Sequence, residues 1–433
     1  MLNLIGVIIA FMFVIILIRK KFNFGLSLIV GSIIVGVFSL QEIQLIDIPK
    51  AMIEASFYSF EKNQIYTSTI ELAVLMTLIY ILAKLMQETG AIKKIIESLR
   101  SIFSKGGILG IIPALYGLMP VPGGALFSAP MIDEEGEKYK LNKNQKNFLN
   151  VWFRHIWFPV YPISSAMITL ILLTNTYSTE QNLGITIHIS FLMLVNIPAF
   201  LAMIIIGLFY LRKYIKKSQN EVKETKKDST GFIYILPPIL PLFFYIFLIN
   251  FGFTEYRAFL IGIIFSIILL YFLLKIEQSE YIKLIKKSLT INLALAIFGI
   301  MIFRQMITVS GTDILIADTI KSLNIPVIFM IVLIPLILGL LTGYNLGAIG
   351  LSFPLVSVFF PSPMNTITIV GYISLIFISS LVGYLISPIH LCNVLSSDYL
   401  KTDTTRMYKM YVPSAIITLL VQILFVELLI NTL

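Results

Sequence analysis

Long apolar segments separated by short polar connections run along almost the whole chain. A helix needs about 20 mostly apolar residues to cross the hydrocarbon core of a bilayer, and ten segments approach this length. They are residues 4–18, 24–40, 69–86, 148–173 and 185–211 in the first half, and residues 232–250, 258–274, 289–309, 367–395 and 411–428 in the second half. The pattern predicts an all-α polytopic membrane protein with five transmembrane spans in each half.

A further apolar segment lies between the third and fourth span of each half, and both are interrupted by proline and glycine. Their sequences are IIPALYGLMPVPGGALFSAP from Ile111 and LIPLILGLLTGYNLGAIGLSFP from Leu333. The backbone groups that such a break frees are tolerated at membrane depth only where protein, water or a ligand satisfies them. We expect each segment to be a re-entrant hairpin that enters and leaves the membrane on one side.

Basic residues test this topology, because cytoplasmic loops of membrane proteins carry an excess of lysine and arginine. With the N-terminus outside and two re-entrant hairpins, 26 of the 32 lysine and arginine residues fall in cytoplasmic segments and four fall outside. A hairpin that crossed completely would reverse every later loop and reduce this bias. The charge distribution therefore predicts that both termini are extracellular and that the basic segment 212–231 is cytoplasmic.

The composition agrees with a membrane protein and excludes other classes. Hydrophobic residues make up 58% of the chain and charged residues 13%, with a mean hydropathy of +0.92, whereas soluble domains carry about 25% charged residues. The net charge of +9 comes mainly from the short loops, so we do not expect a nucleic-acid partner. Cys392 is the only cysteine, which rules out an intrachain disulfide, and no phosphate-binding loop of a primary pump is present.

The second half repeats features of the first. TIELA in the first half matches TINLA in the second, GGALFSAP matches GAIGLSFP, and Pro162 matches Pro388. An odd number of spans per half places the two halves in opposite orientations. We therefore expect two inverted repeats, residues 1–211 and 232–433, joined by a cytoplasmic linker over residues 212–231. Inverted repeats with broken helices are the architecture of alternating-access transporters.

Four helix breaks at matching positions of the two repeats form the predicted site. Half-helix N-termini offer positive dipole ends to an anion, and free carbonyls offer ligands to Na⁺. The binding candidates at or beside the breaks are Pro120, Pro122, Gly123, Gly124, Ser128, Arg154, His155, Tyr161, Pro162, Ser164, Asn345, Gly347, Ser352, Ser387, Pro388, His390 and Asn393. For any single break, an ordinary proline kink is the alternative.

Three ionisable groups lie close to these breaks. Arg154 and His155 are candidates to attract an anion, and the alternative is that Arg154 extends to the membrane surface or binds backbone carbonyls. His390 either carries a proton or packs as a satisfied side chain. No Asp or Glu lies at the centre of a predicted span, so we do not expect a carboxylate proton relay. Coupling then falls to Na⁺, held by neutral oxygen atoms around the hairpin tips, or to H⁺ carried by histidine. No other cofactor is expected.

The motifs LMPVPGGALFSAP and LISPIHLCNVLSSDYL resemble the ion-transporter superfamily, which includes gluconate permeases, citrate transporters and divalent anion–sodium symporters. Within it the chain is most similar, over essentially its whole length, to an uncharacterised prokaryotic membrane family of unknown function. The resemblance implies inverted repeats, a homodimer in the plasma membrane of a prokaryote, and substrate and cation at the hairpin tips. The Ser-Asn-Thr tips of the divalent anion symporters are missing here, so a dicarboxylate substrate is not implied.

These features favour a secondary active transporter of a small solute, coupled to Na⁺ or H⁺. An organic anion is the expected class of solute. A membrane-embedded enzyme is one alternative, although the chain contains no HExxH metal pair and no intramembrane aspartate pair. A passive channel or uniporter is the other alternative, but no filter motif is visible. We expect a non-enzymatic membrane protein whose partners are the lipid bilayer and a small-molecule solute.

Overall fold

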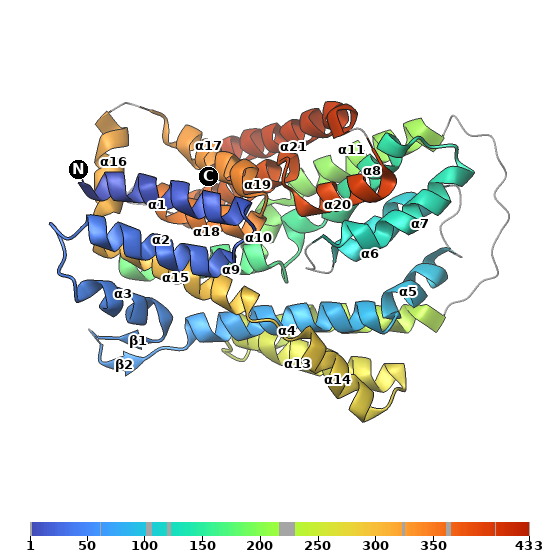
Figure 1. Cartoon of the computed structure of the whole chain (residues 1–433), viewed down its shortest axis with the longest axis horizontal. Helices are drawn as coiled ribbons and strands as arrows, with labels where there is room; N and C mark the ends of the chain where they lie inside the picture. The colour runs from blue at the N-terminus through green and yellow to red at the C-terminus, as the bar shows by residue number, and fades with distance from the viewer. Residues whose placement is uncertain are drawn as a thin grey trace.

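The computed structural model describes residues 2–60, 62–100, 106–118, 123–215, 230–322, 325–360, 365–402 and 404–432. Helices form nearly all of this structure. Its strands are the short antiparallel pair β1 (Tyr58–Ser59) and β2 (Gln64–Ile65). Figure 1 shows many of the long helices running along the long axis of the molecule. This architecture agrees with the predicted all-α membrane protein.

The elements follow the order predicted from the apolar pattern. In the first half they are α1 (Leu2–Arg19), α2 (Phe24–Phe38), α3 (Asp47–Ser56), α4 (Ser68–Glu88), α5 (Ala91–Arg100), α6 (Ile108–Gly117), α7 (Ala125–Lys138), α8 (Lys143–His155), η1 (Phe158–Val160), α9 (Ser165–Glu180), α10 (Ile189–Val195) and α11 (Ile197–Ile215). In the second half they are η2 (Thr230–Ile235), α12 (Leu236–Ile249), α13 (Glu255–Leu274), α14 (Gln278–Ser288), α15 (Asn292–Val309), α16 (Thr312–Ser322), α17 (Val327–Thr342), α18 (Asn345–Val356), η3 (Ser357–Phe359), α19 (Thr366–Ile386), α20 (Leu391–Leu400) and α21 (Thr404–Thr432). The predicted linker falls mostly on residues 216–229, which lie outside the described residues.

Nine helical segments in the described residues are long and apolar enough to cross a membrane. They overlap nine of the ten predicted spans, although the segment Ile197–Ile215 covers only residues 197–211 of the span predicted over residues 185–211. The tenth, predicted over residues 24–40, is the 15-residue helix α2, which is about 22 Å long at 1.5 Å per residue. This short helix packs on α15 through glycine, since a Cβ at Gly25 would lie 2.1 Å from the carbonyl oxygen of Leu295. Small residues allow helix backbones to approach this closely in membranes.

The chain is broken at the four places that the sequence indicates. α6 and α7 are separated by the first tip, of which Gly123 and Gly124 are described, and α17 and α18 by the second tip, Gly343 and Tyr344. Gly343 has a φ of +59°, a left-handed conformation that terminates a helix and favours glycine. The predicted fourth spans divide into α8 and α9, and into α19 and α20. Proline lies in both gaps, where it cannot donate a backbone hydrogen bond.

Helix contacts in the two halves follow one pattern. α6 packs on α8 as α17 packs on α19, α7 contacts α20 as α18 contacts α9, and α2 packs on α15 as α13 packs on α4. Matching glycines make two of these contacts possible. A Cβ at Gly117 would lie 2.0 Å from the carbonyl oxygen of Arg154, and a Cβ at Gly339 would lie 2.4 Å from that of Ser380. Exchanging each helix with its counterpart in the other half therefore reproduces these contacts.

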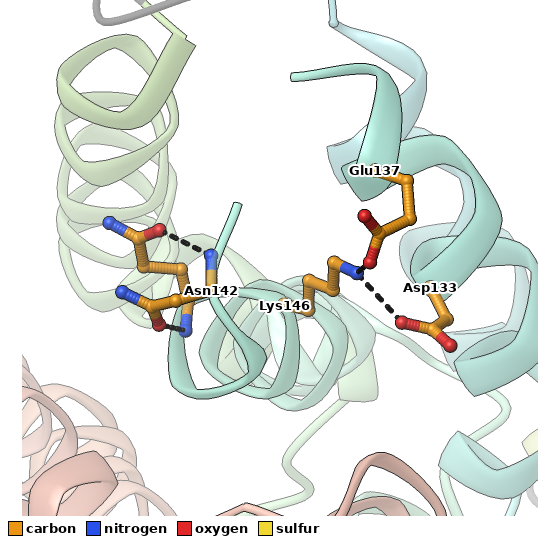
Figure 2. Close-up of polar contacts among 5 residues, drawn as sticks. Asp133, Glu137, Asn142 and Lys146 are labelled. Atoms are coloured by element: carbon orange, nitrogen blue, oxygen red, sulfur yellow. Dashed lines mark hydrogen bonds and ion pairs between the residues drawn. The ribbon is translucent and has the colours of Figure 1, made fainter. Parts of the chain in front are cut away.

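Polar contacts fix the turn between α7 and α8. Asn142 caps α8 by accepting a hydrogen bond from the backbone N–H of Gln145, whose side chain in turn accepts one from the backbone of Asn142. One turn further on, Lys146 reaches back to α7, where its Nζ contacts Asp133 at 2.8 Å and also Glu137, as Figure 2 shows. Because the Lys146 side chain is buried, these contacts hold α7 against the start of α8 and so position the first tip.

Ion pairs join residues that the charge count places on the same side of the membrane. Arg257 contacts Glu71 at 2.8 Å, between helix ends predicted to lie outside. Lys287 contacts Glu88 at 2.9 Å, between segments predicted to lie inside. In Figure 1 the N-terminus, α3, α16 and the β1–β2 pair lie at one end of the molecule, and α5 and α7 lie toward the other. Each of these two ion pairs therefore joins residues that are predicted to lie on the same side of the membrane.

Arg304 is a charged residue within the predicted span 289–309. Long basic side chains near the end of a span usually extend to the membrane surface, but Arg304 does not. In the structure Arg304 is buried, with Nη1 donating to Glu180 Oε1 at 3.0 Å and Nη2 contacting the second carboxylate oxygen. This paired geometry explains how a guanidinium is accommodated there, because a buried charge is stable only when it is paired and hydrogen-bonded.

Candidate functional site

A cavity of about 290 Å³ lies where the described parts of the two tips and of the two broken helices meet. Gly123 lines it from the first tip, and Gly343, Tyr344 and Asn345 line it from the second tip; Phe158, Tyr161, Ser164 and Ser165 come from the first broken helix, and Tyr384, Leu391 and Cys392 from the second. Apolar side chains of α1, α4 and α15 complete the wall. A mostly apolar cavity with a few convergent polar groups, near the lower end of the usual volume range, suits a small ligand.

The charge of this cavity is set by Arg154. The side chain is buried, and its Nη1 donates to the carbonyl oxygen of Tyr116 at 2.7 Å. A Cβ at Gly124 would lie 2.0 Å from Nη2, so the guanidinium rests directly on the backbone of the first tip. Arg154 also lines the cavity, and no Asp or Glu does so among the described residues. Arg154 therefore binds a backbone carbonyl and also faces the cavity, while its attraction of an anion stays a prediction.

Four half-helices, α7, α9, α18 and α20, begin at this cavity. The first N–H groups of a helix have no partner within it. None of the four N-cap residues, Gly124, Ser164, Tyr344 and His390, caps its helix through a side-chain hydrogen bond. The ends therefore direct the positive poles of four helix dipoles toward one space.

Asn345 adds a polar group at the second tip. Its Oδ1 accepts a hydrogen bond from Ser380 Oγ at 2.8 Å. Its Nδ2 is buried and has no hydrogen-bond partner among the described residues. Asn345 lines the cavity, so this amide is a donor for a bound ligand. Arg154 and Ser380 lie on the corresponding helices α8 and α19, and each of them contacts the tip that precedes its helix.

Side chains already satisfy several carbonyls that the breaks expose. The hydrogen bonds run from Tyr161 Oη to Leu118 O at 2.7 Å, from Asn196 Nδ2 to Pro159 O at 2.9 Å, from Ser387 Oγ to Leu340 O at 2.7 Å, and from Tyr408 Oη to Ser387 O at 3.0 Å. These bonds explain how the breaks are stable inside a membrane protein. A carbonyl oxygen has two lone pairs, so each can still accept a second contact.

The histidines of the two broken helices meet beside the cavity. The rings of His155 and His390 have centroids 4.8 Å apart, and that of Tyr384 lies 4.1 Å from His390. His155 Nδ1 is 2.7 Å from the carbonyl oxygen of Val151, and its Nε2 is 3.2 Å from Tyr384 Oη. Cys392, which is also buried, lies with the two histidines. The structure thus brings together residues more than 230 positions apart in the sequence.

Several candidates from the sequence lie behind the cavity wall. Ser128 and Ser352 are buried and bonded within the structure, Ser128 Oγ to Asn150 Oδ1 at 2.5 Å and Ser352 Oγ to Ile349 O at 3.4 Å. Gly124 does not line the cavity either but contacts Arg154, which does. The other predicted site residues that are not among the described lining residues are Ser128, Pro162, Gly347, Ser352, Ser387, Pro388, His390 and Asn393. Pro120 and Pro122 lie outside the described residues.

Sequence reasoning missed two residues that line the cavity, Cys392 and Tyr384. Ser165, Gly343 and Tyr344, which lie at the predicted breaks, line it as well. Cys392 follows His390 by two residues in the motif IHLCN, which was a usable signal for a shared site. Tyr384 lies in a continuous apolar run with no local feature to distinguish it.

Comparison with solved structures gives a whole-chain match. The structure superposes on the crystal structure of the Alcanivorax borkumensis YdaH transporter with a TM-score of 0.60, covering 89% of each chain at 11% sequence identity. A search of curated proteins finds no match to the chain. At this identity the similarity establishes the fold.

The fold and the cavity define a multi-pass helical membrane protein with the fold of a solved transporter. Residues 2–429 match the family described as "Protein of unknown function (DUF401)". The chain belongs to this family, as the resemblance to an uncharacterised membrane family predicted. The kinship with gluconate permeases, citrate transporters and divalent anion–sodium symporters stays a prediction.

Proposed function

We propose that the protein is a secondary active transporter that moves a small organic anion by alternating access, with Na⁺ or H⁺ as the coupling ion. The observation that carries this proposal is the electrostatics of the cavity. Arg154 and four helix N-termini face one small space, and no carboxylate lines it among the described residues. In a low-dielectric interior such a space favours a negative ligand. The fold shared with a solved transporter supports the same conclusion.

Alternating access requires two states of one site, and inverted repeats provide them. The exchange of helix contacts between the halves supports repeats over residues 1–211 and 232–433. In this proposal α6–α7 and α17–α18 are re-entrant hairpins whose tips meet at the bilayer midplane, as broken helices do in transporters. A rocking motion of the repeats would then expose the cavity to each side in turn.

Sidedness follows from the same model. We propose that both termini are outside and the segment 212–231 inside, in the plasma membrane of a prokaryote, with a homodimer as the assembly. Cysteine introduced as Lys226→Cys should react with an impermeant maleimide only after the membrane is opened. Lys50 is an exposed residue of α3. The variant Lys50→Cys should therefore react with the same maleimide in intact cells. Labelling of Lys226→Cys from outside would overturn the topology.

Uptake into proteoliposomes tests the function and separates the coupling ions. Carboxylates, sugar acids and inorganic anions are first screened for a rise in the Tm of the protein, since a ligand that binds the folded state stabilises it.

The best ligand is then supplied to proteoliposomes with a Na⁺ gradient, a pH gradient or neither. If H⁺ drives uptake through His390, His390→Gln should remove its pH dependence. If Na⁺ drives it, uptake should need Na⁺ and survive this substitution in part. Uptake that needs neither gradient would indicate a channel or uniporter.

A further inference from the structure

His155, His390 and Cys392 form a buried cluster with the composition of a metal site. Each offers one ligand atom, a ring nitrogen or the Sγ atom, and these atoms all lie within 4.8 Å of one another. All three side chains are at most 3% exposed. His155 ends α8, while His390 and Cys392 begin α20. We propose that these residues bind a transition-metal ion such as Zn²⁺, and this inference does not rest on the transport function.

The histidine from α20 supplies an independent reason to place a ligand here. Both ring nitrogens of His390 are buried and have no hydrogen-bond partner among the described residues. A buried polar group without a partner destabilises the fold, and in folded proteins such a group often marks an ion or a water. A metal bound to one nitrogen of His390 would satisfy that nitrogen, while the N–H on the other nitrogen would still need a partner.

The histidine from α8 is already oriented as a ligand. A carbonyl oxygen only accepts, so the 2.7 Å contact with Val151 O places the proton of His155 on Nδ1. Nε2 then carries the lone pair and accepts a hydrogen bond from Tyr384 Oη at 3.2 Å, so a metal ion bound to Nε2 would take the place of this hydroxyl. Metal-binding histidines characteristically donate their other N–H to a carbonyl or carboxylate in this way.

Cys392 completes the donor set and selects the kind of metal. It lies in the first turn of α20. Two imidazole nitrogens and one thiolate suit Zn²⁺ and other borderline or soft ions, whereas Na⁺, Mg²⁺ and Ca²⁺ prefer oxygen ligands. Zinc bonds of about 2.0–2.3 Å place tetrahedral ligand atoms roughly 3.5 Å apart. The ligand atoms here lie within 4.8 Å of one another, so they would have to approach by at most about 1.3 Å. Since His155 and Cys392 line the cavity, the fourth position opens toward it.

Wild-type protein in detergent tests this proposal without any substitution. After removal of metals with a chelator, we expect one Zn²⁺ or Co²⁺ to bind per chain, and Co²⁺ to show the near-ultraviolet absorption of thiolate coordination. Cys392 is the only cysteine, so its alkylation reports this site alone. Bound Zn²⁺ should slow that alkylation at least tenfold. Absence of both the Co²⁺ band and the protection would overturn the proposal and leave a water as the occupant.

Variants identify the ligands. Cys392→Ser and His390→Gln should each weaken Zn²⁺ binding at least 100-fold. The matched control is His188→Gln, because His188 contacts Glu255 and lies outside the cluster; its affinity should stay within about twofold of wild type. An equal loss in the control would mean that Zn²⁺ binds elsewhere, and the proposal would fail. Should a ligand variant not fold, the wild-type spectrum and protection still decide.

Discussion

Replacing Arg154 by glutamine should reduce anion uptake at least 100-fold. The substitution removes the positive charge that lines the cavity while keeping a side chain able to donate to the Tyr116 carbonyl. Truncating one partner of a buried, hydrogen-bonded charge pair costs about 2–5 kcal/mol, and 100-fold corresponds to about 3 kcal/mol. The measurement is the initial rate of uptake of the screened ligand into proteoliposomes, together with its Kd in detergent.

Arg257→Gln is the control for the loss of charge. Arg257 is an exposed residue whose pair with Glu71 lies at a helix end, and exposed pairs contribute about 0–1 kcal/mol. This variant should retain at least half of wild-type uptake. Arg154→Lys should recover part of the activity lost in Arg154→Gln, because it keeps the charge without the planar fork. Wild-type Kd and uptake in Arg154→Gln would remove the basis for an anionic substrate.

The substitution Gly124→Ala, which adds one methyl group at the first tip, should also reduce anion uptake strongly. Gly124 has helical backbone angles, with φ of −60° and ψ of −12°, so alanine is compatible with its conformation. Its Cβ would nevertheless lie 2.0 Å from Nη2 and 2.5 Å from Cζ of Arg154. The guanidinium must move away from the tip, and we expect Gly124→Ala to reduce uptake at least tenfold. Uptake rates and Tm are measured on the same preparation.

Two further variants show whether the effect passes through Arg154. Gly371→Ala places the same methyl group in α19, where the nearest atoms belong to the side chains of Val426 and Ile430 at 3.0 and 3.1 Å, so it should be nearly silent. The double variant Gly124→Ala with Arg154→Gln should be no worse than Arg154→Gln alone, since residues that act through one contact are not additive. Additive losses would instead indicate that Gly124→Ala disturbs the tip itself.

Local features of the sequence predicted much of the fold. Apolar runs of membrane length identified nine segments that are long enough to cross, and proline and glycine marked all four breaks. The prediction was less accurate for residues 24–40, because α2 ends at Phe38 and is only 15 residues long. Apolar character alone does not distinguish a full span from a shorter helix packed against its neighbours.

The candidate site was harder to predict. The sequence indicated the breaks as the place for binding, and Gly123, Arg154, His155, Tyr161, Ser164 and Asn345 do line one cavity. It did not indicate that the hydroxyl groups of Ser128 and Ser352 would form hydrogen bonds within the protein and would not line the cavity. Nor did it indicate that Tyr384 and Cys392 would join the histidines, because these contacts link α8 to helices more than 220 residues later.

The sequence by itself determined the membrane class, the positions of the breaks, the distribution of charge and the family. These are properties of composition and of the local backbone, which do not depend on distant contacts. Only the tertiary structure decided that the four breaks surround one cavity, that Gly124 supports Arg154, and that His155 meets His390. A soluble helix reveals its buried face through a polar and an apolar side. Helices in lipid are apolar on both sides and associate through small residues and close packing, so the inward face emerges only when the helices are assembled.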